Sequence, residues 1–237
     1  MSQITYREAL RMALQESMRE DSTIIVMGED VGLYGGAYGV TKGMIEEFGE
    51  KRILDTPISE EGIVGCAVGS AMTGLRPVVE LMYVDFVMLA MDQLANQAAK
   101  IRYMFGGQIS VPMVMRAQGG TGRSGAAQHS QSLEAWMMHT PGLNLAMPAT
   151  VNDAYLLLKH ALKLSDPVVF IEHKMLYTLK GDLNKSESIS WGQAAILRSG
   201  SDFTLVTYSR MVHRALEAAE KLAELGIQAE AIDLRTL

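Results

Sequence analysis

The feature that most constrains this chain is the alternation of short β-branched runs with amphipathic segments through the first 175 residues. We expect strands at residues 23–28, 52–56, 77–83, 111–117, 144–149 and 167–173. We expect helices at residues 6–19, 41–48, 60–74, 85–104, 132–139 and 151–164. Such alternation predicts an α/β fold of three layers, with helices on both faces of a mostly parallel sheet. Ligands of such sheets bind at the carboxyl ends of the strands.

The first helix has a recognisable start. Thr5 and Glu8 have the spacing of a capping box, in which each side chain bonds a free backbone N–H of the other residue. We therefore expect the helix to begin at residue 6.

A second, shorter unit follows. Residues 174–195 are polar and irregular, and then a strand (203–209), a helix (211–225) and another strand (228–234) are expected. One such unit cannot bury both faces of its sheet. We expect a first domain at 1–175, a linker at 176–195 and an incomplete second α/β domain at 196–237.

Composition excludes several classes of protein. Among 237 residues, 21 Lys and Arg stand against 27 Asp and Glu, so nothing suggests a basic surface for nucleic acid. Glu80 and Asp85 interrupt the most apolar stretch, so no membrane span is expected. The single cysteine, Cys66, excludes an intramolecular disulfide and fits a reducing compartment. A soluble, cytoplasmic protein is the simplest expectation.

Several motifs resemble known sites but lack essential parts. Residues 120–125 match G-x-G-x-x-G, but the next expected strand has no acid to hold a ribose. The glycine-rich loop at 32–43 has no G-K-[ST]. The five histidines lack metal-ligand spacing, and no G-x-S-x-G precedes a helix. We therefore predict no nicotinamide site, P-loop, metal cluster or hydrolase triad.

Two polar groups remain open to more than one interpretation. Glu60 follows Ser59 at an expected helix start, where acids are common and capping is the simpler explanation. The less favoured alternative is a carboxylate presented to a ligand at a strand–helix junction. His129 follows a glycine and alanine loop at a strand end, although a lone histidine is more often structural.

Six segments together carry a more specific signal. They are GED at 28–30, LDTPISE at 54–60, GLRPVVELM at 74–82, DQ-x5-AAK at 92–100, AAQHSQSLEAW at 126–136 and DPVVFIEH at 166–173. In this order they resemble the beta subunit of the thiamine-diphosphate-dependent E1 component of 2-oxo acid dehydrogenase complexes. This group includes pyruvate, branched-chain 2-oxo acid and acetoin dehydrogenases. The resemblance implies a pyrimidine-binding module followed by the start of a transketolase C-terminal-like domain.

The resemblance also implies a shared cofactor. Thiamine diphosphate needs Mg²⁺ at its diphosphate, which this superfamily holds with a G-D-G motif, and no G-D-G occurs here. Its aminopyrimidine needs a carboxylate that shares a proton with a ring nitrogen. The resemblance thus implies an E1 alpha subunit that holds the Mg²⁺ and diphosphate, an α2β2 heterotetramer, and an E2 lipoyl acyltransferase that accepts the acyl group.

Residue roles are implied only where this sequence matches the family. Glu60 matches the glutamate of I-S-E and would contact the aminopyrimidine, with Phe86 stacked on that ring and Met82 nearby. His129 matches the histidine of Q-H-S and would assist acyl transfer as an acid, base or charge stabiliser. Glu29 would line a polar passage between two active sites. A potassium site of backbone carbonyls around 112–114 and 161–166 is a further implication.

Two alternatives remain at this point. One is a fragment of a single-chain enzyme of the transketolase or deoxyxylulose-phosphate synthase type, although such enzymes carry G-D-G on the same chain. The other is a non-catalytic assembly subunit that uses only the fold. The ELMYVDF and KIRYMFGG segments look more like acetoin or pyruvate members than branched-chain ones, and the substrate stays open.

Overall fold

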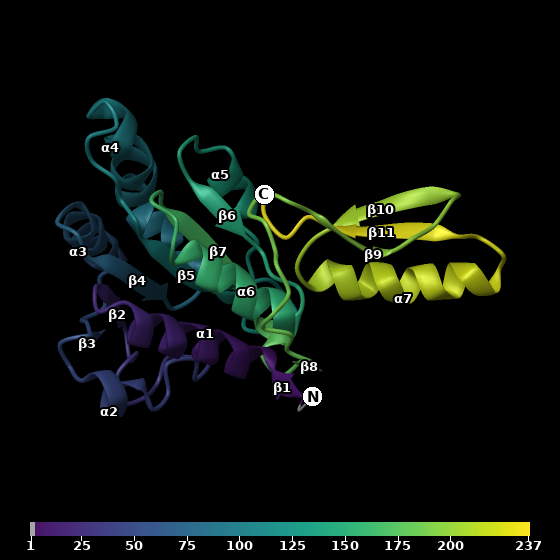
Figure 1. Cartoon of the computed structure of the whole chain (residues 1–237), viewed down its shortest axis with the longest axis horizontal. Coiled ribbons are helices and arrows are strands. Elements are labelled where there is room, and N and C mark those ends of the chain that lie inside the picture. Colours follow the sequence, from purple (N-terminus) through teal and green to yellow (C-terminus); the bar gives the residue numbers. More distant parts are fainter. Residues whose placement is uncertain (1–2) are drawn as a thin grey trace.

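The computed structural model describes residues 3–237 and confirms the α/β fold of the first domain. Six parallel strands form one sheet in the order β3-β2-β4-β5-β7-β6 (Figure 1). The strands are β2 (Ile24–Gly28), β3 (Ile53–Asp55), β4 (Arg76–Leu81), β5 (Val114–Gly119), β6 (Asn144–Ala146) and β7 (Val168–His173). Because all six run the same way, their carboxyl ends meet at one edge, where the expected site residues lie.

Two helices cover one face of this sheet. They are α1 (Tyr6–Glu20) and α6 (Val151–Ala161), which pack against each other (Figure 1). The predicted capping box is present, with the Thr5 side chain accepting from the N–H of Glu8 and the Glu8 carboxylate accepting from that of Thr5. A short helix, α2 (Met44–Phe48), follows the glycine-rich loop. These elements share one apolar cluster with the sheet.

The opposite face of the sheet carries α3 (Glu60–Met72) and a composite helical segment. The single α-helix expected at 85–104 is wrong, because the segment is a 3₁₀ helix η1 (Val84–Ala90), a π-helix η2 (Asp92–Ala98) and an α-helix α4 (Ala99–Met104). The tight first turn lets the Asp85 carboxylate accept bonds from the N–H groups of Ser130 and Gln131, at 3.0 and 2.9 Å. Long-range bonds of this kind leave no trace in hydrophobic periodicity.

The stretch from 174 to 195 is more ordered than its composition suggests. It contains η4 (Lys174–Leu176) and a two-residue strand, β8 (Lys180–Gly181), which pairs antiparallel with β1 (Ile4–Thr5). Apolar side chains of this stretch also pack against the cluster under α1 and α6: Leu179, Leu183, Ile189 and Trp191. The start of the chain is therefore joined to the segment that leads to the second unit.

The second unit is a three-stranded sheet with one helix. Its elements are β9 (Ala195–Arg198), β10 (Phe203–Thr207), α7 (Arg210–Glu224) and β11 (Ala229–Asp233). β11 lies centrally, parallel to β10 and antiparallel to β9, a strand that the sequence pattern missed. The unit projects from the side of the first domain (Figure 1).

Specific polar contacts join the two units. The Arg235 Nε lies 2.8 Å from Asp153 Oδ1, and the Tyr208 hydroxyl donates to Glu134 at 3.1 Å. A single β-bridge joins Ala146 to Thr236. These contacts hold the β10–α7 junction near the carboxyl ends of β5 and β7.

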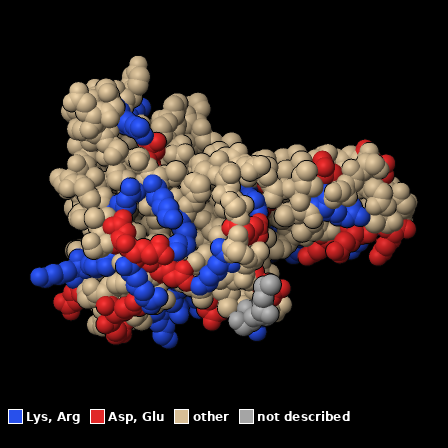
Figure 2. Space-filling model, in the orientation of Figure 1, with Lys and Arg blue, Asp and Glu red and all other residues tan. Residues whose placement is uncertain are grey.

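The surface mixes both signs of charge. Figure 2 shows Lys and Arg interspersed with Asp and Glu over the first domain, and acidic side chains along the outer side of α7. Within residues 3–237, no helix combines the length and the apolar character that crossing a bilayer requires.

Candidate active site

Glu60 is the first residue of α3, at the junction that follows β3. The Ser59 backbone sits at the N-cap, but its hydroxyl makes no capping bond. Glu60 itself is only 9% exposed, and among residues 3–237 no side chain donates a hydrogen bond to its carboxylate. The residue is thus mostly covered, yet its carboxylate oxygens keep contact with solvent and stay open to a ligand. The local geometry therefore favours presentation of Glu60 over a purely capping role.

Glu29 lies close enough to Glu60 for the two charges to interact. It directly follows β2, at the same sheet edge as α3, and is half-buried. Partial burial, then the charge of Glu60 and then that of Asp30 raise the pKa of Glu29 above its usual value. The charge of Glu60 thus favours the protonated form of Glu29.

His129, Phe86 and Tyr83 form an aromatic group at the same edge. The imidazole of His129, which ends η3 (Ala127–His129), lies 4.7 Å from the Tyr83 ring and 5.7 Å from that of Phe86, between centroids. The Phe86 contact is edge to face, at 75°. The fold thus brings His129 and Phe86 into contact, although these residues are 43 positions apart (129 − 86).

The loop that carries His129 is held by its neighbours. The His129 Nδ1 lies 3.0 Å from the carbonyl oxygen of Gly125, and the Lys174 ammonium donates to the carbonyl of His129 itself. Lys174 also sits 5.2 Å above the Tyr83 ring. Burial lowers the pKa of Lys174, and the nearby Asp85 charge opposes that effect. With the Nδ1 side so engaged, the opposite ring nitrogen, Nε2, is the one left for chemistry.

Met82 lies directly after β4 and is half-buried. The same strand leads through Tyr83 into η1, which carries Phe86 and packs against α3. This packing connects the carboxylate pair with the aromatic group. The roles of Met82, Phe86, Glu29, Glu60 and His129 toward a cofactor remain predictions.

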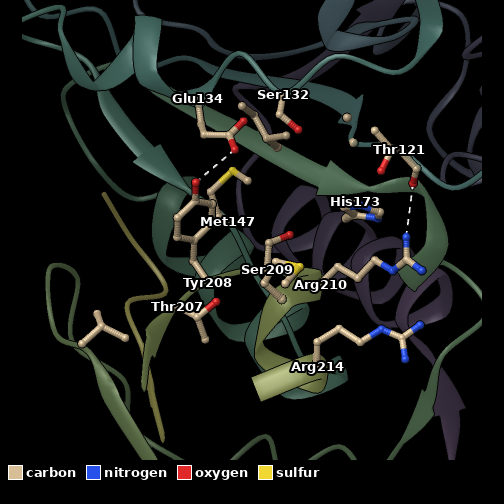
Figure 3. Close-up of a pocket in the computed structure, with 15 residues that line it drawn as sticks. Thr121, Ser132, Glu134, Met147, His173, Thr207, Tyr208, Ser209, Arg210 and Arg214 are labelled. Carbon is tan, nitrogen blue, oxygen red and sulfur yellow. Dashed lines mark hydrogen bonds between the residues drawn. The ribbon is translucent and has the colours of Figure 1, made fainter. Parts of the chain in front are cut away.

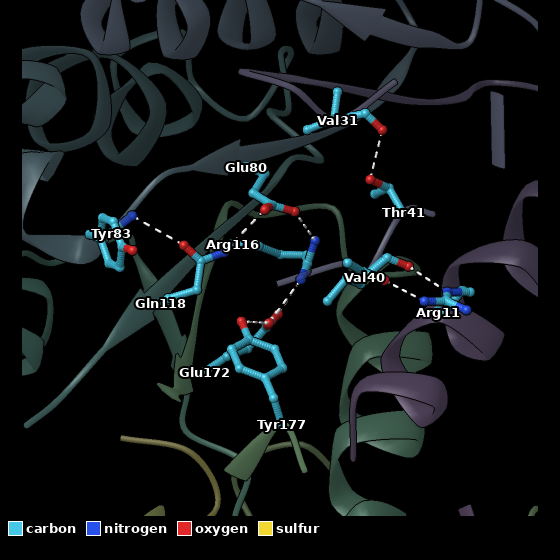
Figure 4. A network of polar contacts seen from close by, with 11 residues as sticks. Arg11, Val31, Val40, Thr41, Glu80, Tyr83, Arg116, Gln118, Glu172 and Tyr177 are labelled. Carbon is cyan, nitrogen blue, oxygen red and sulfur yellow. Dashed lines mark hydrogen bonds and ion pairs between the residues drawn. The ribbon is translucent and has the colours of Figure 1, made fainter. Parts of the chain in front are cut away.

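A buried ionic network beneath this edge was not predicted from the sequence. Arg116 donates to Glu80 at 2.8 Å and forms two bonds to Glu172, at 2.7 and 2.8 Å (Figure 4). The Tyr177 hydroxyl adds a bond to Glu172 at 2.5 Å. Gln118 donates to Glu80 at 3.1 Å and accepts from the backbone N–H of Tyr83 at 3.1 Å. The network is therefore linked to the residue that packs on His129.

The sequence contained a signal for this network. Glu80, Arg116 and Glu172 each follow a run of apolar residues within a strand, and each is fully or almost fully buried. Charges are almost never buried without a partner, so one basic and two acidic residues in buried strands indicate mutual pairing. Burial is the largest influence on Glu172, and its pKa is raised despite the Arg116 charge.

The glycine-rich loop at 32–43 closes over the network. The Thr41 hydroxyl donates to the Val31 carbonyl at 2.7 Å, and Arg11 of α1 donates to the carbonyls of Val40 and Gly39 (Figure 4). Gly36 has a φ of +80°, and a Cβ there would lie 2.9 Å from a Glu80 oxygen. Glycine therefore lets the loop approach the buried carboxylate.

The side chains and carbonyls that could hold a metal ion are few or already engaged. Within residues 3–237, no three His, Cys, Asp or Glu side chains gather as a metal site would require. In the segments expected to hold potassium, the carbonyls of Leu162 and Leu164 accept bonds from Arg76, at 3.1 and 2.9 Å. The Met113 carbonyl accepts from Val168 at 2.9 Å. Arg76 therefore occupies two of the carbonyls in these segments, and the potassium site stays a prediction.

Two family models match this chain. The "Transketolase, pyrimidine binding domain" model matches residues 2–180, and the "Transketolase, C-terminal domain" model matches residues 192–237. Among solved structures, a "Split gene transketolase, inactive beta4 tetramer" superposes with a TM-score of 0.80 at 24% identity, covering 99% of this chain and 72% of the other. That likeness confirms the fold.

Relatives at higher identity indicate the type of enzyme. The beta subunit of acetoin:2,6-dichlorophenolindophenol oxidoreductase from Cupriavidus necator is 46% identical over 99% of this chain and 72% of its own length. The 2-oxoisovalerate dehydrogenase subunit beta of Bacillus subtilis is 46% identical over 100% of this chain and 73% of its own. The pyruvate dehydrogenase E1 component subunit beta of Chaetosphaeridium globosum is 45% identical, with the same coverage. The chain belongs to the family of beta subunits of the thiamine-diphosphate-dependent E1 components of 2-oxo acid and acetoin dehydrogenases.

Proposed function

We propose that this chain supplies the aminopyrimidine half of an active site that an E1 alpha subunit completes. The joint enzyme would cleave a 2-oxo acid of the pyruvate type, or acetoin, and transfer the acyl unit to the lipoyl group of an E2 acyltransferase. The observation that carries this proposal is the carboxylate of Glu60, a mostly buried residue, which has no hydrogen-bond donor among residues 3–237 and lies near enough to Glu29 for its charge to raise the pKa of Glu29.

The residues present fit the pyrimidine end of thiamine diphosphate. When bound, this cofactor supplies the carbon nucleophile for cleavage beside a carbonyl group. Glu60 would hold a proton shared with a ring nitrogen of the pyrimidine, and its burial strengthens that bond by excluding water. Phe86 offers a flat apolar face for the ring, with Met82 nearby. Glu29, with its raised pKa, would exchange protons with Glu60.

His129 would act later in the reaction. Its ring is fixed between Tyr83 and Phe86 and keeps Nε2 unengaged by the loop bonds at its other side. From that position it would donate or accept a proton as the acyl unit passes to the lipoyl sulfur. The Lys174 ammonium, bonded to the His129 carbonyl, would hold the loop in place during that step.

The diphosphate end requires another chain. No G-D-G motif occurs in the sequence, and residues 3–237 gather no acidic cluster for Mg²⁺. Ile58, two residues before Glu60, is 79% exposed, and Leu33 and Tyr34 of the glycine-rich loop are 82% and 70% exposed. Exposed apolar groups of this size mark a surface that a partner covers. We therefore assign Mg²⁺ and the diphosphate to the alpha subunit, in an α2β2 assembly.

The domain limits fit this division of labour. We retain a first domain at 1–175, a connecting segment at 176–195 and a second unit at 196–237. All five proposed site residues lie in the first domain. The second unit would then serve contacts within the assembly.

Cofactor binding tests the proposal directly. Thiamine diphosphate with Mg²⁺ is titrated by calorimetry into this chain, into the alpha subunit, and into the reconstituted pair. We expect tight binding only by the pair. Tight binding by this chain alone would favour the single-chain transketolase type. Tight binding by the pair without turnover of pyruvate, acetoin or 2-oxoisovalerate would favour a non-catalytic assembly subunit.

A further inference from the structure

A cavity of about 540 Å³ lies between the two units of the chain. One side is formed by the ends of β5 and β7, and the other by the junction of β10 with α7 (Figure 3). None of the five residues proposed for the active site lines it. The polar groups in the cavity are therefore not explained by the function proposed above.

Ser209 is the most unusual of these groups. It precedes α7 as the N-cap residue, yet its hydroxyl makes no capping bond. The residue is 3% exposed, and its Oγ has no hydrogen-bond partner. In Figure 3 the hydroxyl points into the cavity. A buried hydroxyl left unpaired costs free energy, so its orientation indicates a ligand that would accept its proton.

Two guanidinium groups lie beside this hydroxyl. Arg210 is the first residue of α7, and Arg214 lies one turn later on the same side of the cavity (Figure 3). One nitrogen of the Arg214 guanidinium donates to Glu217 at 2.7 Å, so Arg210 is the arginine whose charge stays free for a ligand. Among residues 3–237, no carboxylate forms an ion pair with Arg210. Its guanidinium donates a hydrogen bond to the carbonyl oxygen of Thr121, at 3.3 Å. The amino end of a helix of 15 residues adds free N–H groups and a positive dipole.

His173 completes the donor set. Its Nδ1 accepts a bond from the N–H of Met175 at 3.2 Å, so Nε2 carries the proton. Gly120 has a φ of +83°, and a Cβ there would lie 2.3 Å from that Nε2, so glycine keeps the ring in its place at the cavity wall. Burial, Arg210 and Lys174 lower the pKa of His173 to about 4. His173 is therefore a neutral donor at pH 7.

One acid also lines the cavity. Glu134 lies on the side away from Arg214 (Figure 3), and its carboxylate accepts a bond from the Tyr208 hydroxyl at 3.1 Å. Its charge is thus directed toward the contact between the units. The arginine side of the cavity remains rich in donors.

We propose that this cavity binds a small phosphorylated ligand through its phosphoryl group, held by Ser209, Arg210, Arg214, His173 and the amino end of α7. A hydroxyl, two guanidinium groups and backbone N–H groups offer more donors than the two oxygens of a carboxylate can accept, whereas a phosphoryl group presents three oxygens. The proposal is independent of the function assigned to Glu60.

Inorganic phosphate is the probe. It is titrated into the full chain by calorimetry at constant ionic strength, with acetate titrated in parallel. We expect saturable binding of phosphate and weaker binding of acetate. We expect Arg210→Gln and Ser209→Gly each to weaken phosphate binding about tenfold, since each removes a hydrogen bond to a charged group. Glycine suits the Ser209 backbone, whose φ is 52°, so that variant removes the hydroxyl without straining the fold.

Lys221→Gln is the matched control. It removes one positive charge from the last turn of the same helix, outside the cavity. Unchanged phosphate binding in this variant supports the proposal. Equal weakening in Lys221→Gln and Arg210→Gln, equal affinity for acetate and phosphate, or no saturable phosphate binding would each overturn it. Circular dichroism of every variant confirms that the fold is retained.

Discussion

The imidazole of His129 packs on the ring of Tyr83 at 4.7 Å between centroids, with 48° between the ring planes. The backbone N–H of Tyr83 donates to Gln118, which in turn donates to Glu80. Glu80 is fixed by Arg116 in the centre of the sheet. The orientation of the proposed acyl-transfer histidine therefore depends on charges buried beneath it.

Replacing His129 by alanine should separate the two halves of the reaction. We expect His129→Ala to impair acylation of lipoamide by about 10²-fold or more, in the range of lost acid–base catalysis, and to affect the first cofactor step less. Single-turnover assays of the reconstituted pair measure each half separately. Equal losses in both halves would indicate a structural histidine.

Replacing Glu60 by glutamine should remove turnover and leave the fold intact. The amide keeps the size of the side chain but cannot share a proton with the pyrimidine, so we expect a loss of about 10²- to 10⁴-fold in steady-state activity. Glu61→Gln is the control, because Glu61 is the next residue of α3 and is exposed. Normal activity in Glu60→Gln, assayed with the alpha subunit, would reject the assigned role.

Replacing Arg116 should destabilise the whole first domain. Arg116→Met leaves the buried carboxylates of Glu80 and Glu172 without their cation, at a cost of roughly 3–5 kcal/mol of unfolding free energy. Arg19→Met, which breaks an exposed pair with Glu47, should cost far less, because water screens that pair. Denaturant unfolding of both variants provides the measurement. Similar losses of unfolding free energy in the two variants would show that the buried network contributes no more to stability than an exposed ion pair.

Asp233 should make stability depend on pH. Burial raises the pKa of Asp233 from an ordinary value of 3.8 to about 7. The hydrogen bond that its carboxylate accepts from the Arg235 N–H opposes this rise. The folded chain then binds a proton more tightly than the unfolded chain, so stability falls as pH rises from about 4 to 7. We expect Asp233→Asn to stabilise the chain by roughly 1–3 kcal/mol at pH 8 and little at pH 4.

Thermal or denaturant unfolding of the wild type and Asp233→Asn across this pH range measures the effect. A variant whose stability runs parallel to that of the wild type between pH 4 and 8 would show that Asp233 does not titrate in this window. Asp202 offers a control, because it is exposed in the same unit.

The elements of the first domain were predictable because their signals are local. Hydrophobic periodicity located the strands and most helices, and the Thr5–Glu8 capping box predicted where α1 begins. The composite helix at 84–104 was not predictable in this way, since Asp85 bonds to residues 130 and 131, far along the chain. β9 was missed because its strand is short and mostly exposed.

The candidate active site, too, was predictable in part, and the rest depends on long-range contacts. Its residues came from family motifs, since a single glutamate at a helix start carries no chemistry by its pattern alone. The sequence could not predict which of these residues lie near one another in space. Only the fold brings Glu29 beside Glu60, and His129 onto Tyr83 and Phe86. The cavity at Ser209 is lined by residues of both units, so no single sequence motif predicts it.

The pairing of β1 with β8 has a consequence for synthesis. Ile4 and Thr5 leave the ribosome early, but their partners, Lys180 and Gly181, emerge some 175 residues later (180 − 5). The apolar side of α1 is likewise covered only after α6, its packing partner, has been synthesised. During translation the apolar surface of the nascent amino end therefore stays exposed and prone to aggregation until most of the first domain has been made. A chaperone would be needed in that interval.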